Sequence, residues 1–371
     1  MEDIVTYLLY RHDITMKEKE FNEVDALVLS LLAYITWEEI GINKETVVPL
    51  TLACQKYQDY FKEQGNKDTY IFSQRILEVL DKVKDARRYR DIILSRYVIL
   101  DDCDNITQFA AMTFELEENT KFVAYRGTDR TILGWKENVK LLYSPAIHGH
   151  VLASEYLKEV PKSKGLFKKT KLYLGGHSKG AHLAMVAAIM DSDDHHYIQK
   201  VFSFDGPGFL PEFYHDKELA SILPKITNYV PECSVIGRML EHKEKMKVIA
   251  SYAPGLRQHD ATSWKCKVDS FEYLSSFSVE SEELLVSFHQ LVLTKDSETR
   301  KRLMDSLSLW LDTMEMKTLS DMKNLNINKG IQGLVGFTNL QSDERKFMFE
   351  LAGMLVEQAA DILMIKNNTN K

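Results

Sequence analysis

The sequence has few of the residues that build disulfide-bonded or zinc-binding proteins. It contains only four cysteines in 371 residues, and none of them belongs to a C-x-x-C pair: Cys54, Cys103, Cys233 and Cys266. Such wide spacing argues against a disulfide framework and against a zinc site. We therefore expect no metal and no cofactor, and unpaired thiols suit a reducing cytoplasm.

Long apolar runs and an excess of basic charge are also missing. The longest apolar run, "DALVLSLLAYI" (residues 25–35), is too short to span a bilayer. The amino-terminal stretch has acidic residues in front and a short apolar run before Arg11, which makes a poor signal peptide. The formal net charge of −7 offers nothing to attract nucleic acid. We expect a cytoplasmic protein with no integral membrane segment and no nucleic-acid partner.

Apolar periodicity outside the middle of the chain indicates helices. Apolar residues at helical spacing predict helices over 22–36 and 70–86, so residues 1–90 are expected to form a helical segment that packs on a core. Residues 276–371 are expected to form a helical region with two apolar stripes. Between the stripes lies a glycine-containing loop at 326–337, and a lid is a candidate at 324–340.

The middle of the chain, residues 91–275, alternates strand-like and helix-like patterns. Two β-rich runs joined by the polar "EENT" predict a hairpin, and helices then alternate with single strands. Such alternation requires crossover connections, so it predicts an α/β core with a mostly parallel sheet and helices on both faces. The predicted strands are 91–100, 107–116, 121–127, 170–176, 200–209, 225–232 and 247–255.

A G-x-S-x-G motif, "GHSKG" at residues 176–180, lies between a predicted strand and a helix of small residues. In a nucleophile elbow the serine occupies a tight strand-to-helix turn that exposes its hydroxyl. Side chains at Gly176 and Gly180 would collide across so tight a turn. Ser178 is therefore the predicted nucleophile.

A serine nucleophile needs a base, and the base needs an acid. In this fold they follow the serine in the order acid, histidine. His259 lies after a late predicted strand and a Pro-Gly turn, which makes it the predicted base. Asp205 ends the strand after the elbow helix and is the favoured acid, whereas Glu232 ends the next strand, the commoner position, and stays an alternative.

The oxyanion of a tetrahedral intermediate needs backbone N–H donors. One donor comes from the residue after the nucleophile, which is Lys179, and the other from a loop after an earlier strand. That loop is expected at Gly127-Thr128-Asp129, where the Thr128 hydroxyl could add support.

These stretches together resemble an uncharacterised family of bacterial α/β-hydrolases related to the class 3 lipases, over about residues 20–270. The resemblance rests on "FVAYRGTDRTILGWKENVKLLY", "LGGHSKGAHLAMVAA", "FSFDGPGF" and "QHDATSW". It implies an α/β-hydrolase fold and carboxylester hydrolysis, with Ser178 as nucleophile, His259 as base, and Thr128 with Lys179 as the oxyanion hole. Class 3 lipases usually carry an aspartate followed by Val-Pro where this chain has Glu232-Cys233-Ser234, so Glu232 and Asp205 both remain candidates.

The sequence therefore predicts an α/β-hydrolase with added amino- and carboxyl-terminal helices that cleaves a small-molecule or lipid acyl ester. An amidase or thioesterase would use the same three residues. A hydrolase fold that serves only as a binding module is the alternative from another class, because a fold by itself implies no activity.

Overall fold

The computed structural model describes residues 3–64, 73–163, 169–215 and 219–313, together with 337, 340–342, 344–346 and 348–349. Its centre is one sheet of nine strands whose spatial order equals their order in the chain. The strands are β1 (Val47–Pro49), β2 (Ile93–Asp102), β3 (Thr107–Glu117), β4 (Thr120–Tyr125), β5 (Lys171–His177), β6 (Ile198–Phe204), β7 (Ile226–Pro231), β8 (Lys245–Ile249) and β9 (Tyr273–Leu274).

Strand direction divides the sheet into two kinds of connection. Neighbours from β1 to β4 are antiparallel, those from β4 to β8 are parallel, and β9 returns antiparallel to β8. Parallel neighbours need crossovers, and helices α5 to α7 supply the first of them. This mixed sheet with flanking helices is the predicted α/β-hydrolase fold.

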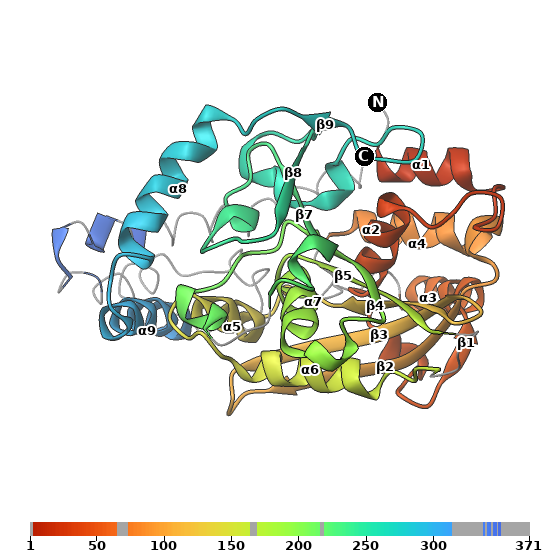
Figure 1. Ribbon diagram of the computed structural model, residues 1–371, viewed down its shortest axis with the longest axis horizontal. Helices are drawn as coiled ribbons and strands as arrows, with labels where there is room; N and C mark the ends of the chain where they lie inside the picture. Colours follow the sequence, from red (N-terminus) through yellow and green to blue (C-terminus); the bar gives the residue numbers. More distant parts are fainter. Residues whose placement is uncertain are drawn as a thin grey trace.

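The helices form three groups around the sheet (Figure 1). One face is covered by α1 to α4 and the other by α6 and α7, while α5, α8 and α9 lie together at one end. Their bounds are α1 (Ile4–Arg11), α2 (Glu23–Leu32), α3 (Leu50–Glu63), α4 (Arg75–Asp85), α5 (Ile132–Leu141), α6 (His148–Glu159), α7 (Lys179–Met190), α8 (Val279–Val292) and α9 (Ser297–Thr313).

Alternating side chains of the strands serve two cores. On β3, Met112 packs with the amino-terminal helices, whereas its neighbour Ala111 packs with α6 and α7. A strand presents successive side chains to opposite faces, so apolar residues in both positions fit a sheet covered on both sides. A third core joins α9 to α5 and to the segment around Val235 and Met239.

The structure adds detail that the periodicity did not predict. The helix expected over 22–36 is the shorter α2, and the strand expected over 247–255 is β8, which begins at Lys245 and ends at Ile249. Helices α1 and α3 lie in the segment expected to be helical but were not predicted individually, and the short strand β1 comes from the same segment. Helix α5 was not predicted.

The carboxyl-terminal region can be followed only in part. Helix α9 buries Leu303, Leu307, Trp310 and Leu311 of the first predicted stripe. The second stripe lies outside the described residues, and so does the candidate lid at 324–340, apart from residues 337 and 340. Among the helices of the described ranges, none is long and apolar enough to cross a membrane.

Candidate active site

Ser178 lies at the corner between β5 and α7, with φ of 57° and ψ of −127°. A non-glycine residue held at positive φ is strained, and such strain persists where the surroundings enforce it. Here the surroundings are close backbone contacts. A Cβ atom on Gly176 would lie 2.3 Å from the Gly180 carbonyl carbon, and one on Gly180 would lie 2.1 Å from the Tyr125 carbonyl oxygen. Only glycine fits at either position, and the turn directs Ser178 toward a pocket.

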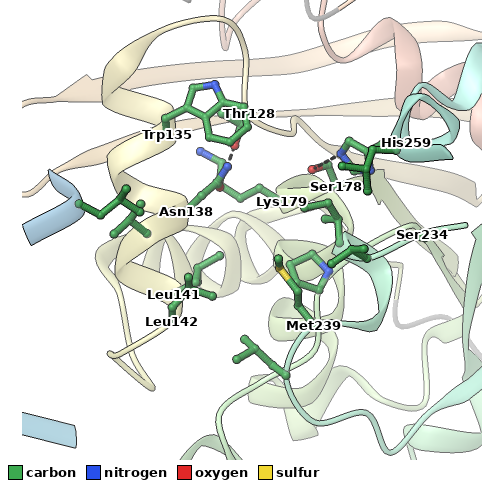
Figure 2. Close-up of a pocket in the computed structure, with 17 residues that line it drawn as sticks. Thr128, Trp135, Asn138, Leu141, Leu142, Ser178, Lys179, Ser234, Met239 and His259 are labelled. Atoms are coloured by element: carbon green, nitrogen blue, oxygen red, sulfur yellow. Dashed lines mark hydrogen bonds between the residues drawn. The ribbon is translucent and has the colours of Figure 1, made fainter. Parts of the chain in front are cut away.

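His259 approaches Ser178 from a different part of the chain. It ends the 3-10 turn Gly255–His259 that follows β8. Its Nε2 lies 3.0 Å from the Ser178 Oγ, and its Nδ1 lies 2.6 Å from Asp205 Oδ2. Since the carboxylate can only accept, Nδ1–H donates to Asp205 and Nε2 accepts from the serine hydroxyl. Figure 2 shows the contact between Ser178 and His259.

Asp205 follows the last residue of β6 and has a φ of 54°. Its side chain is fully buried, and its second oxygen, Oδ1, accepts a hydrogen bond of 2.6 Å from the Ser234 hydroxyl. A Cβ on Gly237 would lie 2.1 Å from that oxygen, so the segment after β7 closes tightly over the carboxylate. The aspartate is therefore held in one orientation by the histidine and by Ser234.

Glu232, the alternative acid, follows β7. Its backbone N–H donates to the Ile249 carbonyl, and its carbonyl accepts from the Ser278 N–H. The Nδ1 of His259 is taken by Asp205. Of the two carboxylates considered from the sequence, the structure brings Asp205 to the histidine.

His177, which precedes the serine, supports His259 from behind. Its buried ring donates from Nε2 to the His259 carbonyl at 2.8 Å and accepts at Nδ1 from the Tyr34 hydroxyl at 2.9 Å. Burial and the neighbouring His259 hold the pKa of His177 well below its usual value, so the ring is neutral. Tyr34 follows α2, so the amino-terminal helices reach the site through this pair.

Thr128 and Lys179 line the same pocket as Ser178 and His259. Lys179 is the first residue of α7, a position whose N–H has no acceptor within the helix. The Thr128 hydroxyl donates to Asn138 Oδ1 on α5 at 2.8 Å, as Figure 2 shows. The two predicted oxyanion residues therefore line the pocket that Ser178 also lines.

A small apolar pocket begins at these residues. Its volume is about 100 Å³, and most of its wall is aliphatic. Leu141 and Leu142 lie on the α5 side, away from Ser178 and His259 (Figure 2). Further apolar wall residues are Val139, Val235, Met239, Leu256 and, from α9, Leu307.

This arrangement can activate a hydroxyl without a metal. His259 can take the serine proton while Asp205 stabilises the resulting imidazolium, and two N–H groups can face the charge that forms. Within the described ranges, no group of three or more His, Cys, Asp or Glu side chains could hold a metal ion.

Sequence reasoning did not identify Asn138, His177 or Ser234 as parts of the site. Asn138 follows Thr128 by ten residues on a helix that was not predicted, and Ser234 follows a different strand from Asp205. His177 is next to the serine in the sequence, but its Nε2 donates to the His259 carbonyl.

This chain is similar to one described protein family and, distantly, to several solved structures. The model of the family described as Mbeg1-like matches residues 83–308. Among solved structures, the Rhizomucor miehei lipase propeptide complex is 13% identical with a TM-score of 0.36, and the match covers 75% of each chain. The lipase from Rhizopus microsporus var. chinensis is 12% identical with a TM-score of 0.31, covering 72% of this chain and 82% of that one. M37 lipase is 15% identical with a TM-score of 0.32, covering 57% and 67%. None of the curated proteins matches this chain significantly.

Proposed function

This chain belongs to the Mbeg1-like family, and from that premise we propose that it is a serine hydrolase that cleaves a carboxylic acyl ester. The observation that carries the proposal is the unbroken series of contacts from Asp205 Oδ2 through His259 to the Ser178 Oγ. The series ends at an apolar pocket that Thr128 and Lys179 also line. A nucleophile, a base, an acid and two donors therefore meet where an acyl group could bind.

The reaction follows from the roles of these groups. Ser178 Oγ attacks the ester carbonyl as its proton passes to His259 Nε2, and Asp205 stabilises the imidazolium. The N–H groups of Lys179 and Thr128 stabilise the oxyanion. His259 then protonates the leaving alcohol, an acyl-serine forms, and water attacks it by the same sequence of proton transfers.

The pocket favours an apolar acyl group of modest length. Its volume of about 100 Å³ is smaller than the roughly 150 Å³ cavity that holds one benzene in another protein. Leu307 of α9 belongs to the wall and is fully buried, so this helix limits the space for the acyl chain. We propose short acyl esters as the best substrates, and a cytoplasmic location in keeping with four free cysteines.

The first experiment is fluorophosphonate labelling of the wild-type protein and of Ser178→Ala, followed by turnover of p-nitrophenyl acetate, butyrate, octanoate and laurate. We expect labelling only of the wild type, and a loss of turnover of about 10⁶-fold in the variant. Turnover should fall from butyrate to laurate, and Leu307→Ala should move the preference toward longer chains.

The same measurement separates the alternatives. Folded wild-type protein that neither labels nor turns over any ester would contradict the proposal and favour a binding module. Labelling with slow ester turnover, and faster hydrolysis of matched thioesters or anilides, would identify a thioesterase or an amidase instead.

A further inference from the structure

A buried ion pair lies directly behind the proposed nucleophile. The side chain of Lys179 is 1% exposed and that of Glu137 on α5 is fully buried, and the lysine Nζ donates to Glu137 Oε2. The same Nζ donates to the carbonyl of Gln108 on β3 at 2.6 Å. A buried lysine is rare, and it is tolerated only where a partner offsets its charge. The residue after the nucleophile is thus tied to a helix and to a strand.

Gln108 lies on β3 at a point where the neighbouring strand β4 has already ended. Arg126 follows the last residue of β4, and its backbone N–H donates a hydrogen bond to the Ala110 carbonyl on β3. Two residues earlier on the same edge, the Gln108 N–H donates to Glu137 Oε2 at 3.1 Å and its carbonyl accepts from Lys179. The ion pair therefore takes the place of a strand neighbour and satisfies both backbone groups of Gln108.

The side chain of Gln108 continues into the loop that holds Thr128. Its Nε2 donates to Thr131 Oγ1 at 2.7 Å, and its Oε1 accepts from the Asp129 N–H at 3.2 Å. A Cβ on Gly134 would lie 2.4 Å from that Oε1 and 2.8 Å from Thr128 Cγ2. The first turn of α5, the glutamine and the loop are thus in close contact, and they leave Thr128 little freedom.

Helix α5 holds both sides of the site through consecutive residues. Glu137 binds the side chain of Lys179, and Asn138 accepts from the Thr128 hydroxyl. Figure 2 shows Asn138 between Thr128 and Lys179. A change at the ion pair is therefore transmitted to the loop through a single helix and a single glutamine.

We propose that Lys179, Glu137 and Gln108 are positioning residues that set the separation between the backbone donors of Lys179 and Thr128. This inference rests on the proposed hydrolase function. Lys179 would then act in two ways. Its backbone N–H faces the oxyanion, while its side chain anchors the loop that carries the second donor, Thr128. Preorganised donors act only when they are held at the place where charge develops.

The test uses the double variant Lys179→Met/Glu137→Gln. It removes both charges together, which avoids leaving one buried ion unpaired, and it keeps an amide oxygen that can accept from the Gln108 N–H. We expect kcat to fall by about 10²-fold, as for the loss of one oxyanion donor, with KM changed less than about twofold. The pH profile of kcat/KM should keep its shape, because Ser178, His259 and Asp205 are untouched.

Gln108→Met is the second variant, in case the double variant folds poorly. It keeps the backbone contacts and loses only the two side-chain hydrogen bonds to the loop, so kcat is expected to fall by a smaller factor than in the double variant. Thr107→Val is the matched control. Thr107 is buried beside Gln108 on β3, but its hydroxyl donates to the Asn105 carbonyl, away from the loop. It should leave kcat unchanged.

Deuterium uptake of peptides covering residues 126–131 provides a readout that does not depend on activity. We expect faster uptake in both test variants and not in Thr107→Val. Unchanged uptake, or faster uptake with unchanged kcat, would overturn the inference. If wild-type protein proves inactive on every ester while uptake still rises in the variants, the hydrolase proposal fails and the bracing of the loop by these residues stands.

Discussion

Two buried ion pairs, one in the amino-terminal layer and one beside the candidate site, differ in how completely their atoms are bonded. Arg88, beside α4, donates to both oxygens of Asp25 on α2, and to the carbonyls of Ile14, Lys19 and Glu20. Asp25 also accepts from the hydroxyls of Tyr7 and Tyr89. Burial holds the pKa of both tyrosines above the usual value, so both remain donors.

The pair at the site is less complete. Glu137 Oε2 accepts from Lys179 and from the Gln108 N–H, but its Oε1 has no hydrogen-bond partner among the described residues. An unsatisfied buried oxygen costs stability. Together with the positive φ angles of Ser178 and Asp205, it marks the site as one region where the fold sacrifices stability, whereas the atoms of the Arg88 and Asp25 pair are bonded more completely.

The largest expected effect is a loss of turnover at the site with little change in the stability of the fold. Asp205→Asn should lower kcat by about 10⁴-fold, because the amide favours the wrong tautomer of His259. The amide oxygen can still accept from Ser234, so unfolding by urea should change little. Glu232→Gln is the control and should keep wild-type turnover. Loss of turnover in Glu232→Gln alone would show that the acid is Glu232.

In the amino-terminal layer we expect the opposite: a loss of stability with unchanged turnover. Arg88→Met leaves Asp25 buried without its cation, so the free energy of unfolding should fall by about 3–5 kcal/mol. Turnover per folded molecule should stay the same, because the network does not contact the pocket. Lys44→Met, which removes an exposed pair with Glu159, should change the unfolding free energy by less than about 1 kcal/mol. Equal stability losses in the two variants would contradict the comparison.

A smaller effect concerns the histidines behind the elbow. His150 on α6 and His182 on α7 are buried, and their Nε2 atoms lie 2.9 Å apart. Burial lowers the pKa of His182 to about 4 and that of His150 well below its usual value. The unfolded chain binds these protons more readily, so stability is complete above about pH 6.5 and is lost as the pH falls toward 4.

At pH 5, His182 alone should reduce the free energy of unfolding by about 2 kcal/mol relative to pH 7.5. Urea unfolding at the two pH values measures the difference, and His182→Gln should show a smaller one. The network of Arg88, Asp25, Tyr7 and Tyr89 includes no histidine, so it should not contribute. An equal pH effect in wild type and His182→Gln would locate the source elsewhere.

The sequence predicted the fold because its signals are local. The α/β-hydrolase fold is confirmed by the mixed nine-stranded sheet and its flanking helices, and the prediction followed from strands and helices that alternate along the chain. A strand of apolar residues, a glycine-flanked serine and a helix of small residues occupy twenty consecutive positions, so no distant contact was needed to recognise the elbow. Helices α1 and α3 were not predicted individually, and α5 was not predicted. Helix α5 carries a charged residue, Glu137, at a position that tertiary contacts bury.

The roles at the site depended on contacts between distant segments. Ser178, Asp205 and His259 follow three different strands of the parallel part, β5, β6 and β8, and the order of the strands in the sheet brings the three residues together. Sequence position alone could not choose between Asp205 and Glu232, because both follow strands of the parallel part. The distance to His259 Nδ1 distinguishes them.

By itself, the sequence determined where the strands and the serine turn lie. The steric need for glycine in the turn and the apolar periodicity of strands and helices both act over a few consecutive residues. Only the tertiary structure decided which side chains are hydrogen-bonded to one another. Gln108, Glu137 and Lys179 are separated by 29 residues or more in the chain, yet they form one buried cluster. Hydrogen bonds and ion pairs need atoms about 3 Å apart in space, and the number of residues between two positions in the chain does not predict that distance.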